Sequence, residues 1–149
     1  MKMPIEKKLT VPLSAAEAFA LFTTEMDLWW PKETHSVKGA KSKVTFPTHK
    51  DGEILEEGPD GSRNVWGKLI AYDPREYLAF TWHPGRGEEE ATVVTVAFTQ
   101  KEDGTLCELT HGGFSILGDT ADAVSTSYLK GWDMVLGCFA SAVKTPALT

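Results

Sequence analysis

The sequence predicts a single α+β domain, residues 1–149, in which a curved antiparallel sheet wraps around a long C-terminal helix. Three observations support this fold class: a helix signal directly after the first strand, a series of short strand-like runs separated by turns, and a long amphipathic pattern near the end. With 149 residues, 42% of them hydrophobic, the chain is long enough to bury one core. The apolar face of the final helix is expected to lie across the sheet.

The N-terminal segment predicts one strand followed by two short helices. The strand covers Ile5–Val11 and ends at a proline, which cannot donate to a strand ladder. A helix begins directly afterwards, because Ser14 and Glu17 have the spacing of a capping box and an apolar face follows them. Residues 26–30 predict a second helical turn that ends before Pro31, since the residue before a proline disfavours the helical conformation.

Six further strands are predicted between residues 44 and 111, separated by turns rich in Gly, Pro and Asp. They cover Val44–Phe46, Glu53–Glu57, Val65–Tyr72, Tyr77–Trp82, Ala91–Thr99 and Thr105–His111. Short strands joined by tight turns are typical of an antiparallel meander. We therefore expect a sheet of about seven strands.

Alternation of apolar and polar residues predicts which side chains face the core. In the last three strands these are Leu78, Phe80, Trp82, Val94, Val96, Phe98, Cys107, Leu109 and His111. The strand 65–72 is apolar on both faces, and Lys68 makes the face opposite to it the better inner face. On that basis the inward-pointing residues of this strand are expected to be Val65, Gly67, Leu69 and Ala71.

The C-terminal helix is predicted by apolar residues that recur at steps of three and four over about six turns. These residues are Ala121, Val124, Tyr128, Trp132, Val135, Phe139 and Ala142. Gly131 and Gly137 interrupt the helix, where each is less favourable than alanine by about 1 kcal/mol. We expect them to permit a close approach of the helix to the sheet; room for a ligand is the alternative.

Charge and composition argue against several classes of function. The formal net charge is -6 and Lys and Arg do not cluster, so we expect no nucleic-acid partner. The sequence has no transmembrane run and no signal-peptide pattern, so no integral membrane association is expected. Cys107 and Cys138 lack CxxC spacing, which predicts free thiols in a reducing cytoplasm.

Metal, cofactor and phosphate sites are not expected either. The four histidines lack the HxH and HExxH spacings of metal ligands, and neither cysteine belongs to a chelating motif. The glycine-containing segment 84–87 is followed by three glutamates, 88–90, whose charge would repel a phosphate. We interpret this segment as a solvated hairpin tip.

The candidate ligand-binding residues are mostly aromatic: Trp30, Phe46, Phe80, Trp82, His111, Tyr128 and Trp132. A sheet and one helix seldom need so many large rings for a compact core, which favours the wall of a cavity, although core packing also explains the helical pair. His111 lands on an apolar face, where it would hold a ligand's polar end or act as acid or base with Tyr128. Alternatively, it is a core histidine whose ring N–H bonds a backbone carbonyl or Tyr128.

Several short fragments, in their order and spacing, carry a resemblance to a known family. They are Val11-Pro12-Leu13-Ser14, Glu17-Ala18-Phe19, Trp29-Trp30-Pro31, His35-Ser36, Trp66-Gly67-Lys68-Leu69, Asp73-Pro74, Phe80-Thr81-Trp82, Gly131-Trp132 and Val135-Leu136. Over nearly its whole length the chain resembles the START-related SRPBCC superfamily, in the branch similar to the activator of heat-shock-protein-90 ATPase. The resemblance implies a helix-grip fold with a cavity between the sheet and the C-terminal helix.

The resemblance also implies ligand classes, because relatives bind lipids, sterols, polyketides or other apolar molecules in this cavity. The leading hypothesis is therefore a protein that binds a small hydrophobic molecule, as a monomer or weak dimer. One alternative is a cyclase or dehydratase that uses His111 and Tyr128 as acid and base. The other is a protein-interaction module with a chaperone as partner.

Overall fold

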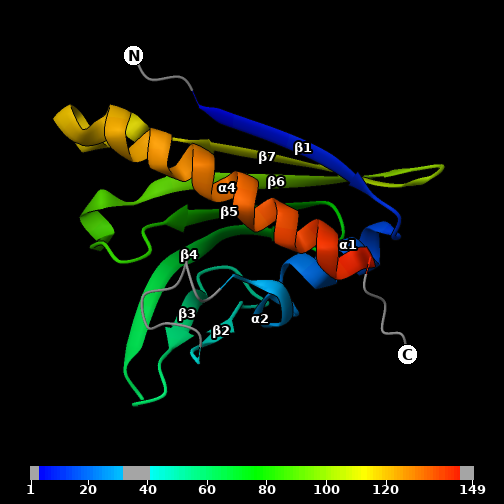
Figure 1. The fold of residues 1–149 in the computed structure, drawn as a ribbon, viewed down its shortest axis with the longest axis horizontal. Helices are drawn as coiled ribbons and strands as arrows, with labels where there is room; N and C mark the ends of the chain where they lie inside the picture. Colours follow the sequence, from blue (N-terminus) through cyan, green and yellow to red (C-terminus); the bar gives the residue numbers. More distant parts are fainter. Residues whose placement is uncertain (1–3, 32–40, 145–149) are drawn as a thin grey trace.

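The computed structural model describes residues 4–31 and 41–144 and contains a seven-stranded antiparallel sheet in the order β1-β7-β6-β5-β4-β3-β2. The strands are β1 Ile5–Val11, β2 Lys43–Thr45, β3 Glu53–Glu57, β4 Arg63–Asp73, β5 Tyr77–Trp82, β6 Thr92–Lys101 and β7 Gly104–Gly112. The helical segments are α1 Ala15–Phe22, α2 Met26–Trp29, η1 Glu88–Glu90, η2 Phe114–Thr120 and α4 Ala121–Lys144. Figure 1 shows α4 lying across the curled sheet, which confirms the predicted α+β helix-grip fold.

The two short helices lie between β1 and β2, as predicted. The capping box of α1 is present: the Ser14 hydroxyl accepts a hydrogen bond from the Glu17 backbone N–H, and the Glu17 carboxylate accepts one from the Ser14 N–H. α2 ends at Trp29, and the next residue, Trp30, has an extended conformation (φ -59°, ψ 133°) before Pro31. This bend directs the Trp30 ring into the interior, where it is 6% exposed.

The prediction for the inner face of β4 was partly wrong. Leu69 points inward as expected, but Trp66, which belongs to the opposite predicted face, is fully buried. The reason is a β-bulge: Ile54 pairs with Gly67 while Leu55 pairs with Val65, which leaves Trp66 as the extra residue. A second irregularity at Ile70, between the pairs of Leu69 and Ala71, shifts the pattern again.

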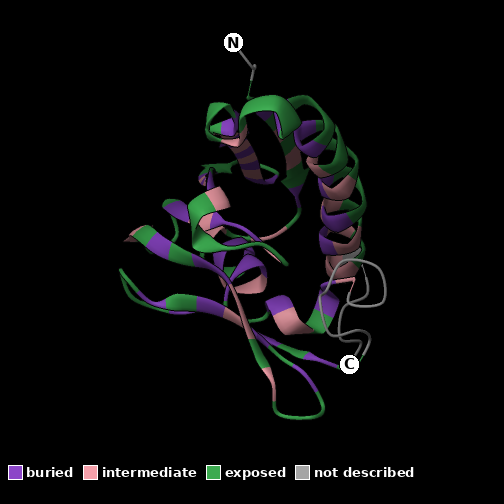
Figure 2. Ribbon diagram, turned by 90° about the vertical axis from the view of Figure 1, so that its left-hand side faces the viewer, coloured by how far each residue is buried: buried purple, intermediate pink, exposed green. Residues whose placement is uncertain are grey.

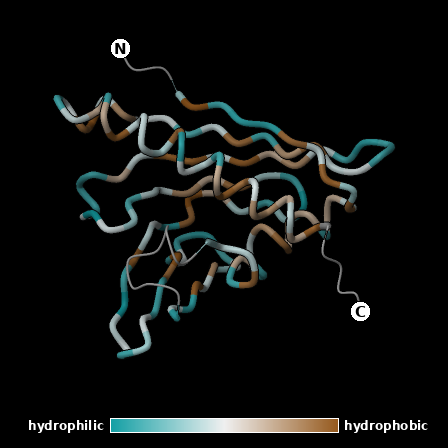
Figure 3. The backbone as a smooth tube through the Cα atoms, in the orientation of Figure 1, coloured by the Kyte–Doolittle hydropathy of each residue, from teal (hydrophilic) through white to brown (hydrophobic). Residues whose placement is uncertain are grey.

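The core lies between the sheet and α4. All nine residues that alternation assigns to the inner faces of β5, β6 and β7 are buried, as predicted. Figure 2 shows buried residues on the side of α4 that faces the sheet and exposed residues on its outer side. In Figure 3 the hydrophilic residues gather at the ends of the hairpins, away from this core.

The apolar face of α4 is confirmed, whereas the expectation for Gly137 is wrong. Five of the seven predicted residues are buried, and Tyr128 and Ala142 are half-buried. A Cβ added at Gly137 would meet no atom within 4 Å outside its own helix, so this glycine permits no close approach to the sheet. None of the helices in residues 4–31 and 41–144 is both long and apolar enough to cross a membrane.

Candidate functional site

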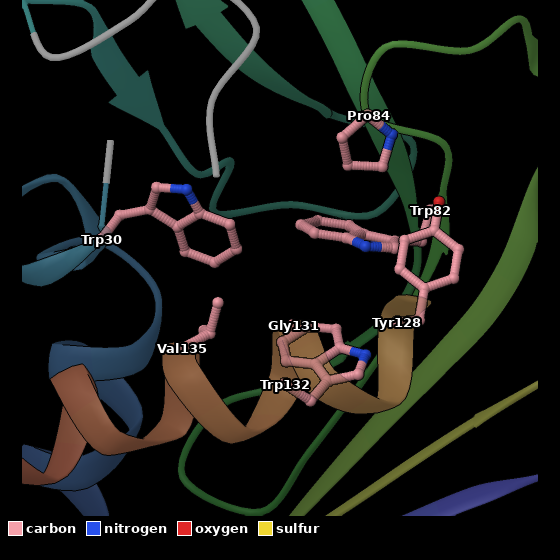
Figure 4. Close-up of a pocket in the computed structure, with 7 residues that line it drawn as sticks. All are labelled: Trp30, Trp82, Pro84, Tyr128, Gly131, Trp132 and Val135. Carbon is pink, nitrogen blue, oxygen red and sulfur yellow. The ribbon is translucent and has the colours of Figure 1, made fainter. Parts of the chain in front are cut away.

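A small cavity of about 100 Å³ lies between one face of α4 and the segments that follow α2 and β5. It is lined by Trp30, Trp82, Pro84, Tyr128, Gly131, Trp132 and Val135. The four helical residues have spacings of one, three and four, so they share one face of α4. Figure 4 shows the rings of Trp30, Trp82 and Trp132 arranged around this space, with Val135 beside them. Because Pro84, Tyr128 and Gly131 are only half-buried, the cavity reaches the surface on their side.

The walls of the cavity are indole rings in mutual contact. The ring centroids of Trp82 and Trp132 are 5.6 Å apart with an interplanar angle of 31°. Trp30 lies 5.9 Å from Trp82 and 5.0 Å from Trp66, which stands behind both. The Trp30–Trp82 pair meets edge to face, a favoured arrangement of aromatic pairs, and the other two pairs are tilted. The cavity therefore presents flat, apolar surfaces at fixed angles.

His111 fixes the orientation of Trp132. The Trp132 indole Nε1–H donates to His111 Nδ1 at 2.9 Å, and His111 Nε2 lies 2.6 Å from the Thr92 hydroxyl. That hydroxyl also donates to the Trp82 carbonyl at 3.2 Å. Since Nδ1 accepts, the proton of the neutral ring resides on Nε2 and bonds Thr92. Both ring nitrogens are thus engaged within the protein.

Burial keeps this histidine neutral. The His111 side chain is fully buried, and desolvation lowers its pKa from 6.5 to about 3. Its ring packs on Tyr128 and Phe114, with centroids 4.7 and 4.8 Å away. The sequence left open whether His111 meets a ligand or is a core histidine; its bonds match a core histidine, with Thr92 and Trp132 as partners in place of a carbonyl or Tyr128. The acid or base role with Tyr128 has no support in this geometry.

The rings of Trp30, Trp66, Trp82 and Trp132 form an indole cluster, and a second buried polar pair holds the side of it opposite to His111. The Trp66 Nε1–H donates to the Glu56 carboxylate at 3.0 Å, and both side chains are fully buried. Glu56 points inward because it alternates with Ile54 along β3. The pair holds the Trp66 ring against Trp30, so hydrogen bonds orient indoles at two ends of the cluster. Neither residue was among the predicted site residues, and the sequence placed Trp66 on the outer face of its strand.

Tyr128 is the polar residue of the cavity wall. Its phenol is half-buried, and desolvation raises its pKa, while the positive charge of Arg86 opposes the rise. Figure 4 shows its hydroxyl directed away from α4, toward the end of the cavity where Pro84 lies. Residues 85–87 are exposed, as expected for a solvated hairpin tip, whereas Pro84 lines the cavity.

The structure brings together four of the seven predicted site residues. Trp30, Trp82, Tyr128 and Trp132 line the cavity. Phe80 lies one layer behind, 5.5 Å from the Trp82 ring, and Phe46 packs on Phe80 at 5.7 Å. Three lining residues were not among the predicted site residues: Pro84, Gly131, for which room for a ligand was the alternative, and Val135, which was predicted only as part of the apolar helix face. Gly131 and Val135 carry the helical spacing from Tyr128, which is the signal that identifies them.

A wider hollow lies on the outer side of the molecule, between α2 and α4. It measures about 810 Å³ and is lined by Leu21, Leu28, Trp29, Asp133, Met134, Gly137, Cys138, Ser141 and Ala142. Leu28 is 78% exposed and Met134 is 46% exposed, so this hollow is an open surface groove. The smaller interior cavity offers more complete desolvation, and it is the candidate site for this reason. Within the described residues no three His, Cys, Asp or Glu side chains are grouped as metal ligands.

The comparisons with known proteins agree with this architecture. A family model described as Activator of Hsp90 ATPase homolog 1-like protein matches residues 12–144. The chain belongs to this family. Fragment His35-Ser36 of the resemblance lies outside the described residues. A comparison with curated proteins finds no match.

Three solved structures illustrate the fold that this chain shares. Protein MLL2253 from Mesorhizobium loti has 14% identity and a TM-score of 0.73, over 96% of this chain and 98% of its own. The anthrahydroquino-γ-pyrone synthase Txn09, solved as a complex, has 27% identity and a TM-score of 0.59, over 83% of this chain and 84% of its own. DynU16, from the dynemicin biosynthetic locus, has 14% identity and a TM-score of 0.70, over 97% of this chain and 48% of its own.

Proposed function

We propose that this protein binds a small, flat, apolar molecule in the cavity between α4 and the sheet. The observation that carries the proposal is the wall itself: three indoles, Trp30, Trp82 and Trp132, face one space that no described side chain fills. Planar rings bind well between planar aromatic walls, because they exclude water from both faces at once. Trp132 is also held by His111, so little ordering is required when a ligand enters.

The volume favours an aromatic ligand among the classes that the family fold allows. A cavity of about 150 Å³ accommodates benzene, and the cavity here is about 100 Å³. It therefore encloses at most part of one ring, with the rest of that ring at the open side of the cavity, whereas a sterol or an acyl chain would need far more room. Burial of about 100 Å² of a ring contributes about 2.5 kcal/mol. A ring of this size binds weakly, so the natural ligand is expected to extend from the cavity toward Pro84 and Tyr128.

The relatives add support for a polyketide-like ligand. Txn09, at 27% identity, is a synthase whose name describes a fused-ring aromatic compound, and DynU16 comes from a biosynthetic locus. Compounds of this kind are flat and largely apolar, as the indole walls require. We infer ligand binding as the basal function of the cavity and catalysis as the alternative for it. The likeness to a synthase is the observation that favours the alternative.

A cavity-filling variant tests the proposal. Val135→Phe adds a ring inside the cavity, and Met134→Phe adds the same ring on the outer side of α4, where Met134 is 46% exposed. Overpacking is expected to destabilise the first variant by about 1–3 kcal/mol, so its fold is checked by circular dichroism. Toluene is titrated into each protein while the tryptophan indole N–H signals are followed by NMR.

The expected result is that toluene shifts these signals in the wild type and in the Met134→Phe protein, with at least a tenfold weaker response in Val135→Phe. Equal responses in all three proteins would show that toluene binds elsewhere, and no response in the wild type would overturn the proposal. Native mass spectrometry of protein purified from its own host then identifies the retained ligand. Turnover of that ligand would establish the enzymatic alternative.

The remaining expectations about partners and compartment are separate proposals. We infer a reducing compartment such as the cytoplasm, because Cys107 and Cys138 are both free. A monomer or weak dimer is expected, which sedimentation equilibrium measures directly. A chaperone partner is suggested by the family description, and stimulation of an Hsp90 ATPase by this protein tests it.

A further inference from the structure

The loop between β5 and β6 forms a hydrogen-bonded turn at the rim of the cavity. The Arg86 N–H donates to the His83 carbonyl at 2.8 Å, and Gly85 between them has φ 75°. A type II turn needs a positive φ at its third position, which glycine adopts readily, and proline is common at its second position. The His83 ring nitrogen Nδ1 also lies 3.0 Å from the Arg86 carbonyl oxygen and braces the same turn. Pro84 is thereby held in the cavity wall.

This turn also places Arg86 beside the polar residue of the cavity. The Arg86 guanidinium forms an ion pair with Glu90 at 2.7 Å, and its positive charge acts on the hydroxyl of Tyr128, which lines the cavity. A guanidinium has only donors, so it attracts the lone pairs of the Tyr128 oxygen and leaves the hydroxyl proton for another acceptor. A positive charge near the oxygen also makes the hydroxyl a stronger hydrogen-bond donor.

The charges around the rim of the cavity favour a neutral over a negatively charged hydrogen-bond acceptor on the ligand. Arg86 is compensated by Glu90, and Glu88 and Glu89 are exposed on the same loop. A carboxylate ligand would meet one arginine and three acidic side chains, which disfavours a full negative charge at close range. A neutral carbonyl oxygen has no such repulsion and accepts the hydroxyl proton equally well.

We propose that Tyr128, positioned by Arg86, recognises a neutral hydrogen-bond-accepting oxygen, so that the ligand is a flat aromatic carbonyl compound. Its ring lies among the indoles and its carbonyl oxygen points to the rim beside Pro84. This inference rests on the proposed function, since it specifies the polar end of the molecule whose apolar part the cavity binds. Tyr128 is the recognition residue, and Arg86 is a positioning residue.

Three single-ring probes of nearly the same shape test it: acetophenone, α-methylstyrene and benzoate. Acetophenone carries the carbonyl oxygen, α-methylstyrene has a methylene in its place, and benzoate carries the negative charge. Each is titrated into the full chain and the indole N–H signals are followed by NMR. We expect the wild type to bind acetophenone about threefold to tenfold more tightly than α-methylstyrene, as one net hydrogen bond requires. Benzoate is expected to bind most weakly.

Matched variants assign the preference to the two residues. Tyr128→Phe removes only the hydroxyl and is expected to bind acetophenone and α-methylstyrene equally, with the affinity for α-methylstyrene unchanged. Arg86→Met should reduce the preference in part, because the hydroxyl remains without the positive charge that acts on its oxygen. Tyr77→Phe makes the same chemical change at a residue 39% exposed on β5, and should keep the wild-type preference.

The outcomes separate this inference from the proposed function. Equal binding of acetophenone and α-methylstyrene by the wild type, or tighter binding of benzoate, would overturn carbonyl recognition while the apolar cavity stands. A preference that persists in Tyr128→Phe would do the same. No binding of any probe would overturn the apolar site itself, and carbonyl recognition with it.

Discussion

His111 gives the sharpest test of how the cavity wall is held, because its protonation is coupled to folding. The ring is neutral in the folded protein, where it accepts from Trp132 and bonds the Thr92 hydroxyl. In the unfolded chain it titrates with its ordinary pKa. The substitution His111→Gln keeps an acceptor and a donor at the end of the side chain but removes the titration. The difference between the two proteins across pH therefore isolates this one ring.

The size of the stability loss follows from the pKa of His111 in the folded protein and in the unfolded chain. Between pH 6.5 and pH 3 the unfolded state binds a proton at His111 that the folded state does not, so the stability of the folded protein decreases as the pH falls. With a folded pKa of about 3 against 6.5 unfolded, the loss between pH 7 and pH 5 is about 2 kcal/mol. The free energy of unfolding of a domain of this size is about 5–15 kcal/mol in total. The protein thus stays folded, with a measurable decrease.

Urea unfolding at pH 7 and pH 5 measures this loss in both proteins. The Gln variant has a lower stability at both pH values, because it loses the ring contacts with Phe114 and Tyr128. Carboxylates titrate alike in the two proteins and cancel in the comparison. The wild type should lose about 2 kcal/mol more than the variant between the two pH values. Equal losses would refute the description of His111 as a buried neutral acceptor.

Three further predictions concern the fold and the reactivity of the two cysteines. Gly67→Ala should prevent stable folding, because its Cβ would lie 1.7 Å from a backbone carbonyl oxygen of β5. Gly137→Ala has open space around it and should stabilise α4 by about 1 kcal/mol, and thermal unfolding measures both variants. Ser14→Ala removes the capping box of α1 and should decrease the free energy of unfolding by about 1 kcal/mol in urea titrations. Burial raises the pKa of Cys107 to about 12, so a thiol reagent at pH 8 should modify the half-buried Cys138 first, and peptide mass spectrometry identifies the site.

The elements of this fold were predictable because each has a strong local pattern. The capping box of Ser14 fixes the start of α1, and alternation fixes the inner faces of β5, β6 and β7. β4 was the exception, because alternation assumes one regular register along the strand. The bulge at Trp66 exists only in the pairing of β3 with β4, so no pattern within the strand reveals it.

The site was less predictable, because its polar contacts join residues distant in the sequence. Residues on one face of α4, such as Tyr128 and Trp132, follow from helical spacing. The partners of His111 lie 19 and 21 residues away on other elements, and spacing contains no information on them. Three glutamates follow Arg86 closely in the sequence, and this local pattern predicts an exposed loop. Only the effect of its charge on Tyr128, which is distant in the sequence, relates that arginine to the cavity.

The indole cluster has a spectroscopic consequence. All five tryptophans form one continuous series, Trp29, Trp30, Trp66, Trp82 and Trp132, with successive centroids between 5.0 and 6.0 Å apart. Chromophores this close exchange excitation energy and couple their electronic transitions. The ultraviolet emission and near-ultraviolet circular dichroism of the protein therefore report on one coupled array that borders the cavity. A ligand that quenches the fluorescence of one of these tryptophans should decrease the emission of all five, so the intrinsic fluorescence of the protein reports ligand binding without an added label.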